Sequence, residues 1–400
     1  MQIDLEDVPQ DKIQLFLDHL RVRLPYQSNV RIALDETGDF AEESCTLLLD
    51  FGHHDLVPIR FTVRWKQHGS LLKLVAESDS PDDWRSPLEQ LVRQAIADAR
   101  ADRVQRFFQN ELFAYVGSPL VGEYRFGGHR LAQVSPNDVD LRIPVEHAVL
   151  LSFHVDAADQ PRATTLAAAR ATDFMTALGA ILGVGFYRFD HVHQWGYGTD
   201  NSTVRTRHAF KSDETPMEMP TPPPSHERGA LCVRGDELTS APGHTIGRET
   251  LGVWHDTAEL LEGLERVSLV DRKRFMNTAR LYRIALVSGR RMVTLRLAYE
   301  IAALDALSQG SGGSARDAVE DLVRETVPDA DPGIIREVYS KVRSAHFHSG
   351  QLVPADSRSN LVVIAPFMGN RDHAGWFRLE RTIWMALTEW LRGRIAMATS

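Results

Sequence analysis

The chain has 400 residues, more than one hydrophobic core ordinarily organises, so its length favours two domains. Apolar residues make up 43% and charged residues 25%, which is typical of a folded globular protein and excludes a disordered one. The formal net charge of −9 excludes attraction to nucleic acid by bulk charge, so any site for a polyanion has to be a local basic patch.

The sequence also favours a cytoplasmic protein. Its first residues, MQIDLEDVPQDK, are acidic and lack an apolar core, so no signal peptide is expected. No run approaches the ~18–20 consecutive apolar residues that cross a bilayer, and no membrane partner is expected. Cys45 and Cys232 stand far apart without a C-x-x-C pair, so neither a disulfide framework nor a cysteine-rich zinc site is expected.

The first half of the chain mixes strand and helix patterns. In IRFTVRW (59–65) apolar and polar residues alternate, which is the period of a half-buried strand. Apolar runs on either side of this segment predict an antiparallel meander. Strands are expected at 46–51, 59–65, 71–76 and 148–155, and helices at 87–108 and at about 162–182.

Composition divides the chain at residues 211–247. This segment is rich in proline, glycine and polar residues and has little apolar surface to bury, which is typical of a linker. The predicted fold class is α+β. We expect a mixed α+β domain with antiparallel strands and a sensing or regulatory role over 1–210, and an all-α helical bundle over 248–400.

Several signals mark helix starts after the predicted linker. Asp256 and Glu259 stand in capping-box spacing. Asp331 followed by Pro332 is an N-cap with proline at the first helical position. A last long helix is predicted at 376–395, completing an antiparallel bundle.

The segment VYSKVRSAHFHSGQL (338–352) places one arginine and two histidines before the helix stop expected at Gly350. At about 100° per residue, Arg343 and His346 lie about 60° apart around the helix, and Arg343 and His348 about 140° apart. A titratable imidazole beside a permanent guanidinium suits proton transfer at a phosphodiester. The alternative is that these side chains only interact with exposed carbonyl groups at the helix end.

These residues carry a resemblance to a known family. YSKVRSAHFHSG, preceded about thirty residues upstream by LRLAYEIAALDALS, resembles the HEPN superfamily, most closely its Apea-like branch, over roughly 270–397. That family has an Arg and then, after four to six residues, a His near the end of a helix, and Arg343 and His348 fit this spacing. The acidic position of its earlier helix corresponds to Asp305, and His346 is a second candidate imidazole.

The resemblance implies an α-helical, metal-independent RNA endonuclease that needs no cofactor. Arg343 would bind the scissile phosphate, His348 would act as acid and base, and Asp305 would orient the site, with His346 in reserve. The RNA 2′-hydroxyl would attack its own phosphate, and two protomers would pair through the bundle as a homodimer. Many members are toxins or antiphage defence effectors. Others are non-catalytic modules that bind RNA or a nucleotide, or dimerisation scaffolds in defence complexes, and this alternative remains open.

A basic run over 271–296 favours an anionic ligand. It contains a single acidic residue, Asp271, and so forms a local positive stripe able to contact several RNA phosphates. The alternative is a solvated helix face whose arginines pair with acids elsewhere. The candidate RNA-binding residues are Arg272, Lys273, Arg274, Arg280, Arg283, Arg290, Arg291 and Arg296.

The sequence offers one weak metal-binding pattern. His191 and His193, two residues apart beside Asp190, place two potential zinc ligands on one strand face. No third ligand accompanies them, so no metal site is expected.

Overall fold

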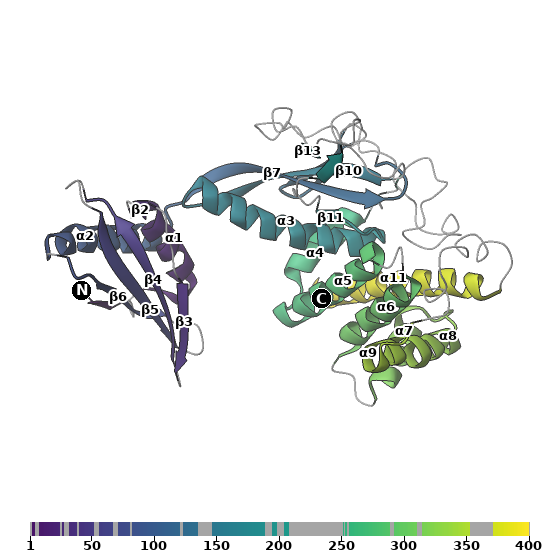
Figure 1. Cartoon of the computed structure of the whole chain (residues 1–400). Coiled ribbons are helices and arrows are strands. Elements are labelled where there is room, and N and C mark those ends of the chain that lie inside the picture. The colour runs from purple at the N-terminus through teal and green to yellow at the C-terminus, as the bar shows by residue number, and fades with distance from the viewer. Residues whose placement is uncertain are drawn as a thin grey trace. The chain divides into compact units, whose positions relative to one another are not determined.

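The fold was obtained as a computed structural model of the chain. It describes residues 2–4, 8–24, 26–27, 32–37, 40–51, 56–66, 71–80, 82–120, 123–134, 146–188, 194–197, 204–207, 251, 253, 256–288, 292–309, 314–352 and 371–399. Within these ranges the protein is α+β, with antiparallel sheets and helices in the N-terminal part and a helical C-terminal region, as the sequence predicts (Figure 1). The predicted linker at 211–247 and the histidine pair His191 and His193 lie outside the described residues.

The chain divides into two compact units, each built from separate stretches of sequence. The first comprises Met1–Gln109 and His154–Leu166, and the second comprises Asn110–Phe153 and Ala167–Ser400. The second unit thus joins strands from the first half of the chain to the C-terminal helices, whereas the sequence-based division placed them in separate domains.

The first unit contains the predicted antiparallel meander. In its register Leu47 pairs with Ile59 and Phe61 with Ala76, and the pairing of β5 with β6 shifts between Arg64 and Trp65. The sheet order is β1 (Gln2–Asp4), β6 (Leu71–Glu77), β5 (Val57–Lys66), β4 (Phe40–Leu49) and β2 (Tyr26–Gln27), and β3 (Ile32–Thr37) also pairs with β4.

Two helices, α1 (Ile13–Arg23) and α2 (Arg85–Arg100), share one apolar core with this sheet. Phe16 of α1, Leu88 of α2 and Ile59 of β5 are fully buried in it. The helix predicted over 87–108 is too long, because α2 ends at Arg100 and Gln105 already begins a strand. Asp102 takes a left-handed conformation (φ +50°) between them, which aspartate tolerates and which ends the helix.

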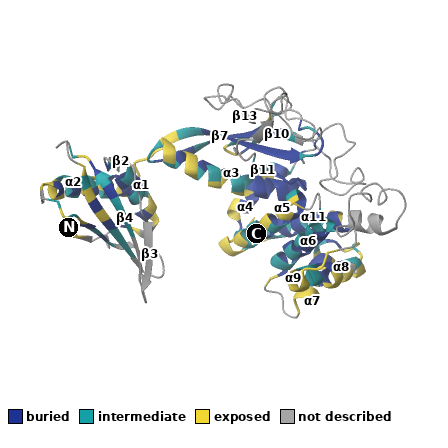
Figure 2. Ribbon diagram, viewed as in Figure 1, coloured by how far each residue is buried: buried dark blue, intermediate teal, exposed yellow. Residues whose placement is uncertain are grey.

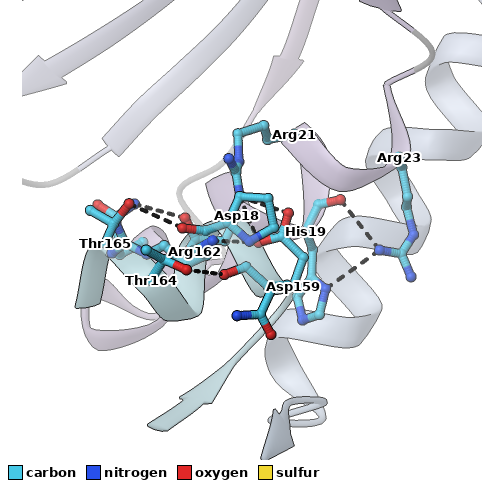
Figure 3. Close-up of polar contacts among 11 residues, drawn as sticks. Asp18, His19, Arg21, Arg23, Asp159, Arg162, Thr164 and Thr165 are labelled. Carbon is cyan, nitrogen blue, oxygen red and sulfur yellow. Dashed lines mark hydrogen bonds and ion pairs between the residues drawn. The ribbon is translucent and has the colours of Figure 1, made fainter. Parts of the chain in front are cut away.

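Polar contacts join elements of the first unit around α1 (Figure 3). Arg21 donates two hydrogen bonds to Asp159 at 2.7 and 2.8 Å, and Arg162 forms an ion pair with Asp18 at 2.9 Å. Asp159 also accepts a hydrogen bond from the backbone N–H of Arg162 at 2.8 Å, so it caps the start of α3 (Gln160–Leu182). The contacts thereby fix the first turn of that helix against α1.

The second unit contains a five-stranded antiparallel sheet. Its order is β11 (Tyr187–Arg188), β7 (Gln105–Val116), β10 (Glu146–Ala157), β9 (His129–Gln133) and β8 (Glu123–Phe126), and β12 (Gln194–Tyr197) pairs separately with β13 (Val204–Arg207). The alanine-rich helix expected after β10 is α3 (Gln160–Leu182). The first residues of β7 and the last of β10, together with the first turns of α3, belong to the first unit.

The C-terminal helices follow one another as predicted. They are α4 (Thr257–Arg266), α5 (Leu269–Ser288), α6 (Val293–Ser308), α7 (Ala315–Thr326), α8 (Pro332–Val338), α9 (Ala345–Ser349) and α11 (Arg371–Thr399). More than half of the residues of α6 are buried, and α11 packs against it (Figure 2). Helix α4 contacts β8, and Trp384 of α11 donates a hydrogen bond to the Ile181 carbonyl of α3 at 2.8 Å. These contacts explain why the sheet and the helices form one unit.

The capping box predicted at α4 does not form. Asp256 is the N-cap residue, but its side chain makes no capping hydrogen bond. Its carboxylate instead accepts two hydrogen bonds from Arg392 of α11, at 2.6 and 3.1 Å. A guanidinium offers this carboxylate a stronger, charge-assisted partner than a backbone N–H.

Candidate active site

The helix that carries Arg343 is interrupted by a wider turn. It starts as predicted, because the Asp331 side chain accepts a hydrogen bond from the backbone N–H of Gly333 at 2.8 Å. Residues Tyr339–Ser344 then form a π-helical turn before α9. Such turns are rare and are often found at functional sites. The angular separations expected for a regular α-helix therefore do not apply through this turn.

The end of α9 is fixed by glycine, as the sequence predicts. Gly350 has a left-handed conformation (φ +64°) that most residues with a Cβ avoid. Its N–H donates to the His346 carbonyl at 2.9 Å, and the next N–H, from Gln351, donates to the Ala345 carbonyl at 3.2 Å. The carbonyl of His346 is thus engaged in the cap, and the ring of His348 lies in the last turn.

Two of the predicted catalytic residues meet across the bundle. A terminal nitrogen of Arg343 donates to the carboxylate of Asp305, on α6, at 2.7 Å. Both side chains are largely enclosed, with exposed fractions of 23% and 20%. The guanidinium carbon lies 5.1 Å from the centre of the Tyr339 ring and 5.7 Å from that of Phe347. The Asp305 carboxylate and the two rings therefore hold the Arg343 guanidinium in place from three sides.

The charges of this cluster affect the pKa of Tyr339. Burial, together with the nearby Asp305 carboxylate, raises the pKa of the Tyr339 hydroxyl above its usual value. Sequence analysis did not identify Tyr339 or Phe347 as site residues. Their spacing of four residues on either side of Arg343 is the signal that was available.

The two histidines differ in their surroundings. His346 is half-buried, and its Nδ1 atom is enclosed without a hydrogen-bond partner in the described part of the chain. His348 is exposed. Among the described residues, neither ring hydrogen-bonds to Arg343 or Asp305. Phe347, which is 44% exposed, contacts the rings of His346 and Tyr299 edge to face.

The basic residues of the predicted stripe occupy several different environments. Arg272 pairs with Glu265 at 2.5 Å and Arg280 with Asp173 at 2.9 Å. Arg283 donates to the Phe186 carbonyl at 2.7 Å, and burial, with Arg188 nearby, lowers the pKa of its guanidinium. These three arginines are thus engaged within the second unit.

The remaining residues of the stripe are also dispersed. Lys273 is exposed and Arg274 half-buried, and neither forms an ion pair within the described ranges. Arg296 lies inside the bundle and pairs with Glu300 and Glu380. Arg290 and Arg291 lie outside the described residues. Lys273 and Arg274 are therefore the described members best placed to meet an external anion.

The interior of the bundle contains a charged network that sequence analysis missed. Arg296 of α6 lies 3.2 Å from Glu300 and 2.7 Å from Glu380 of α11, and the Glu300 side chain is fully buried. Burial raises the pKa of Glu300 to about 8; Arg296 opposes the rise and Glu380 adds to it. Burial and the same two carboxylates raise the pKa of Tyr282 well above its usual value. One cation between two buried carboxylates favours keeping a proton on one of them.

Comparison with known proteins gives no match for this chain, whether to a family model, to a curated protein or to a solved structure. Among the described helices, none is long and apolar enough to cross a membrane. Among the described residues, no group of three or more His, Cys, Asp or Glu side chains is arranged to hold a metal ion.

Proposed function

We propose that the protein is a metal-independent RNA endonuclease of the HEPN type that acts as a toxin or as an antiphage defence effector. The observation that carries the proposal is the ion pair between Arg343 and Asp305. These two residues were selected from sequence on separate helices, and their side chains lie 2.7 Å apart. The toxin or defence role rests on the family resemblance described above.

Arg343 has the properties needed for a phosphate-binding group. One of its terminal nitrogens is bonded to Asp305, while its Nε atom has no hydrogen-bond partner in the described part of the chain. Asp305 and the rings of Tyr339 and Phe347 restrict the guanidinium to one orientation. A preoriented cation stabilises the charge that develops on the non-bridging phosphate oxygens better than a mobile one.

His348 supplies the proton transfers in this proposal. The RNA 2′-hydroxyl oxygen forms a bond to the adjacent phosphorus while His348 accepts its proton. The bond from that phosphorus to the 5′-oxygen of the next nucleotide breaks, and an imidazolium donates a proton to the leaving oxygen. The products are a 2′,3′-cyclic phosphate and a 5′-hydroxyl. No metal takes part in these steps.

A second copy of the chain completes the site in this proposal. His348 is exposed and has no hydrogen bond to Arg343 within one chain. A homodimer paired through the helices would bring a second Arg343 and a second His348 into one cleft, one imidazole then acting as base and the other as acid. Lys273 and Arg274 would contact phosphates further along the RNA.

A non-catalytic function is the second candidate, and two observations favour it. The charge of Arg343 is already balanced by Asp305, and neither His346 nor His348 hydrogen-bonds to this pair among the described residues. In that case the same helices would bind RNA or a nucleotide without cleaving it, or would serve as a dimerisation scaffold in a defence complex.

Cleavage in the presence of EDTA separates the two candidates. The purified full chain is incubated with tRNA and mRNA, and the same assay is run on Arg343→Ala, His348→Ala and His346→Ala. An endonuclease of the proposed type cuts with EDTA present and loses activity in Arg343→Ala and in His348→Ala. Loss in His346→Ala alone would move the acid/base role to His346. Binding without cleavage favours the non-catalytic module, and cleavage that survives all three substitutions places the active site elsewhere.

A further inference from the structure

A cavity of about 680 Å³ lies in the second unit, away from the residues proposed for catalysis. It is lined by the β8–β9 turn and by residues of α3, α4 and α5, all of which belong to that unit. Its volume is within the range of small-molecule sites, about 300–1,000 Å³. Such cavities typically combine apolar walls with a few polar groups, and the lining residues show both.

One wall of the cavity is aromatic. The ring of His129 stacks on that of Phe174, with centroids 4.2 Å apart and planes 15° apart, and Phe126 lies 6.1 Å from Phe174. Burial, with Arg170 nearby, lowers the pKa of His129 to about 4, so this ring is neutral at physiological pH. The wall therefore offers flat, uncharged surfaces on which a planar ring can stack.

The charges of the lining decide which planar ring fits. Two guanidinium groups, those of Arg170 and Arg272, face three carboxylates, those of Asp173, Glu262 and Glu265. This balance is net negative, so it does not favour a ligand with several phosphates. It favours a neutral or cationic ring that presents hydrogen-bond donors.

Glu262 is the carboxylate open to such donors. Asp173 already pairs with Arg280, and Glu265 with Arg272. Glu262 is exposed on α4 and forms no ion pair or hydrogen bond within the described ranges. A carboxylate accepts two parallel N–H bonds when the donors are adjacent on a planar group.

The turn between β8 and β9 keeps one side of the cavity open. Gly127 has a left-handed conformation (φ +56°), which favours glycine at that position. Gly128 does not have a positive φ, so its backbone accepts other residues. A Cβ at Gly128 would meet nothing within 4 Å. Because a Cβ has open space at Gly128 and the backbone φ there is not positive, a larger side chain at this position can be used to fill the cavity entrance.

We propose that this cavity binds a planar heteroaromatic ring with adjacent N–H donors, as in guanine, packed against Phe174 and donating to Glu262. The same chemistry can come from a free guanine nucleoside or from an unpaired guanine of RNA. This site is separate from the proposed catalytic residues, so its occupancy can be measured whether or not the protein cleaves RNA.

Calorimetric titration of the full chain with guanosine, inosine and guanosine triphosphate tests the proposal. Guanosine binds, and inosine, which lacks the 2-amino donor, binds at least about tenfold more weakly because one charge-assisted hydrogen bond is lost. The triphosphate binds no more tightly than guanosine. A single-stranded oligonucleotide with one guanine competes with guanosine if the natural ligand is an unpaired guanine of RNA. It does not compete if the natural ligand is a free nucleoside, and either result agrees with the proposal.

Two variants and a matched control locate the binding. Glu262→Gln weakens guanosine binding about tenfold and removes the preference over inosine. Gly128→Phe abolishes binding with an unchanged melting temperature. Glu259→Gln, an exposed position of the same helix that does not line the cavity, leaves binding unchanged. No guanosine binding to the wild type, or equal binding to wild type, Glu262→Gln and Gly128→Phe, overturns the proposal.

Discussion

Asp305 of α6 and Arg343 of the π-helical turn form an ion pair at 2.7 Å between side chains that are both about four-fifths enclosed. A contact of this kind orients a guanidinium more than it stabilises a fold, because the residual exposure screens the attraction. The pair joins residues 38 positions apart in the sequence. It is therefore the feature around which the proposed site is organised.

The first prediction concerns this pair. Asp305→Asn keeps the side-chain shape but removes the charge, so Arg343 loses its fixed orientation. We expect about 1 kcal/mol of lost stability and about a tenfold loss of RNA cleavage, measured with a fluorogenic oligonucleotide. Arg343→Lys should cost more, about 100-fold, because an ammonium group cannot replace the planar fork.

An arginine on the same helix provides the control for these variants. Arg336 pairs with Glu320 at 2.6 Å and lies 59% exposed. Arg336→Lys should leave cleavage within about twofold of wild type. Equal effects of Arg336→Lys and Arg343→Lys would mean that the substitutions act through the fold, not through a site.

The second prediction concerns the buried carboxylate Glu300. Its pKa is raised from 4.5 to about 8, so the folded state retains a proton that the unfolded state releases. Stability should therefore fall as pH rises from about 4.5 to about 8, by at most about 1.4 kcal/mol per pH unit. Chemical denaturation across this range measures the slope.

Glu300→Gln isolates this contribution. The variant keeps a neutral hydrogen-bonding group in the same place, so it should lose the downward slope and be more stable than wild type at pH 8. Glu259→Gln, at an exposed position, should retain the wild-type slope. An unchanged slope in Glu300→Gln contradicts the assignment of the proton to this network.

The third prediction concerns His129, for which stability should change with pH in the direction opposite to that for Glu300. Its pKa is lowered from 6.5 to about 4, because burial disfavours the charged ring. The unfolded state binds the proton first, so stability should fall as pH drops from about 6.5 to about 4. His129→Phe removes the titrating group from the aromatic wall, so the variant should lose less stability than wild type between about pH 6.5 and pH 4. If the variant loses as much stability as wild type over this range, other groups cause the fall.

The fourth prediction concerns the first unit. Asp98 is fully buried and accepts from Arg103 at 2.8 Å and from Gln94 at 3.2 Å, and it also pairs with Arg23. Asp98→Ala leaves these donors without a common acceptor and should cost about 2 kcal/mol. Hydrogen exchange should show faster exchange in α1 and α2. Unchanged protection there would show that the contacts contribute little.

Much of the fold could be predicted because local patterns decided it. The alternation in 59–65 identified β5, and the alanine-rich run identified α3. The end of α2 could not be predicted, since helical spacing continues past Arg100 while Asp102 turns the chain. The cap at Asp256 failed for a non-local reason, because its competing partner, Arg392, lies 136 residues away.

The candidate site was also predictable in part, where local sequence patterns determine it. The spacing of Arg343 and His348 and the acidic position at Asp305 are local features, whereas the π-helical turn is not encoded in any motif that was recognised. Arg296 appeared in sequence as part of a positive stripe. Its carboxylate partner on α11 is far away in the chain, so its burial inside the bundle emerged only from the packing of helices.

The most direct test of the central claim is the chemistry of the RNA ends produced by the purified chain in EDTA. Cleavage through Arg343 and His348 predicts 2′,3′-cyclic phosphate and 5′-hydroxyl ends, with no product from Arg343→Ala or His348→Ala at wild-type stability. Ends bearing a 5′-phosphate, or products that persist undiminished in both variants, would contradict it.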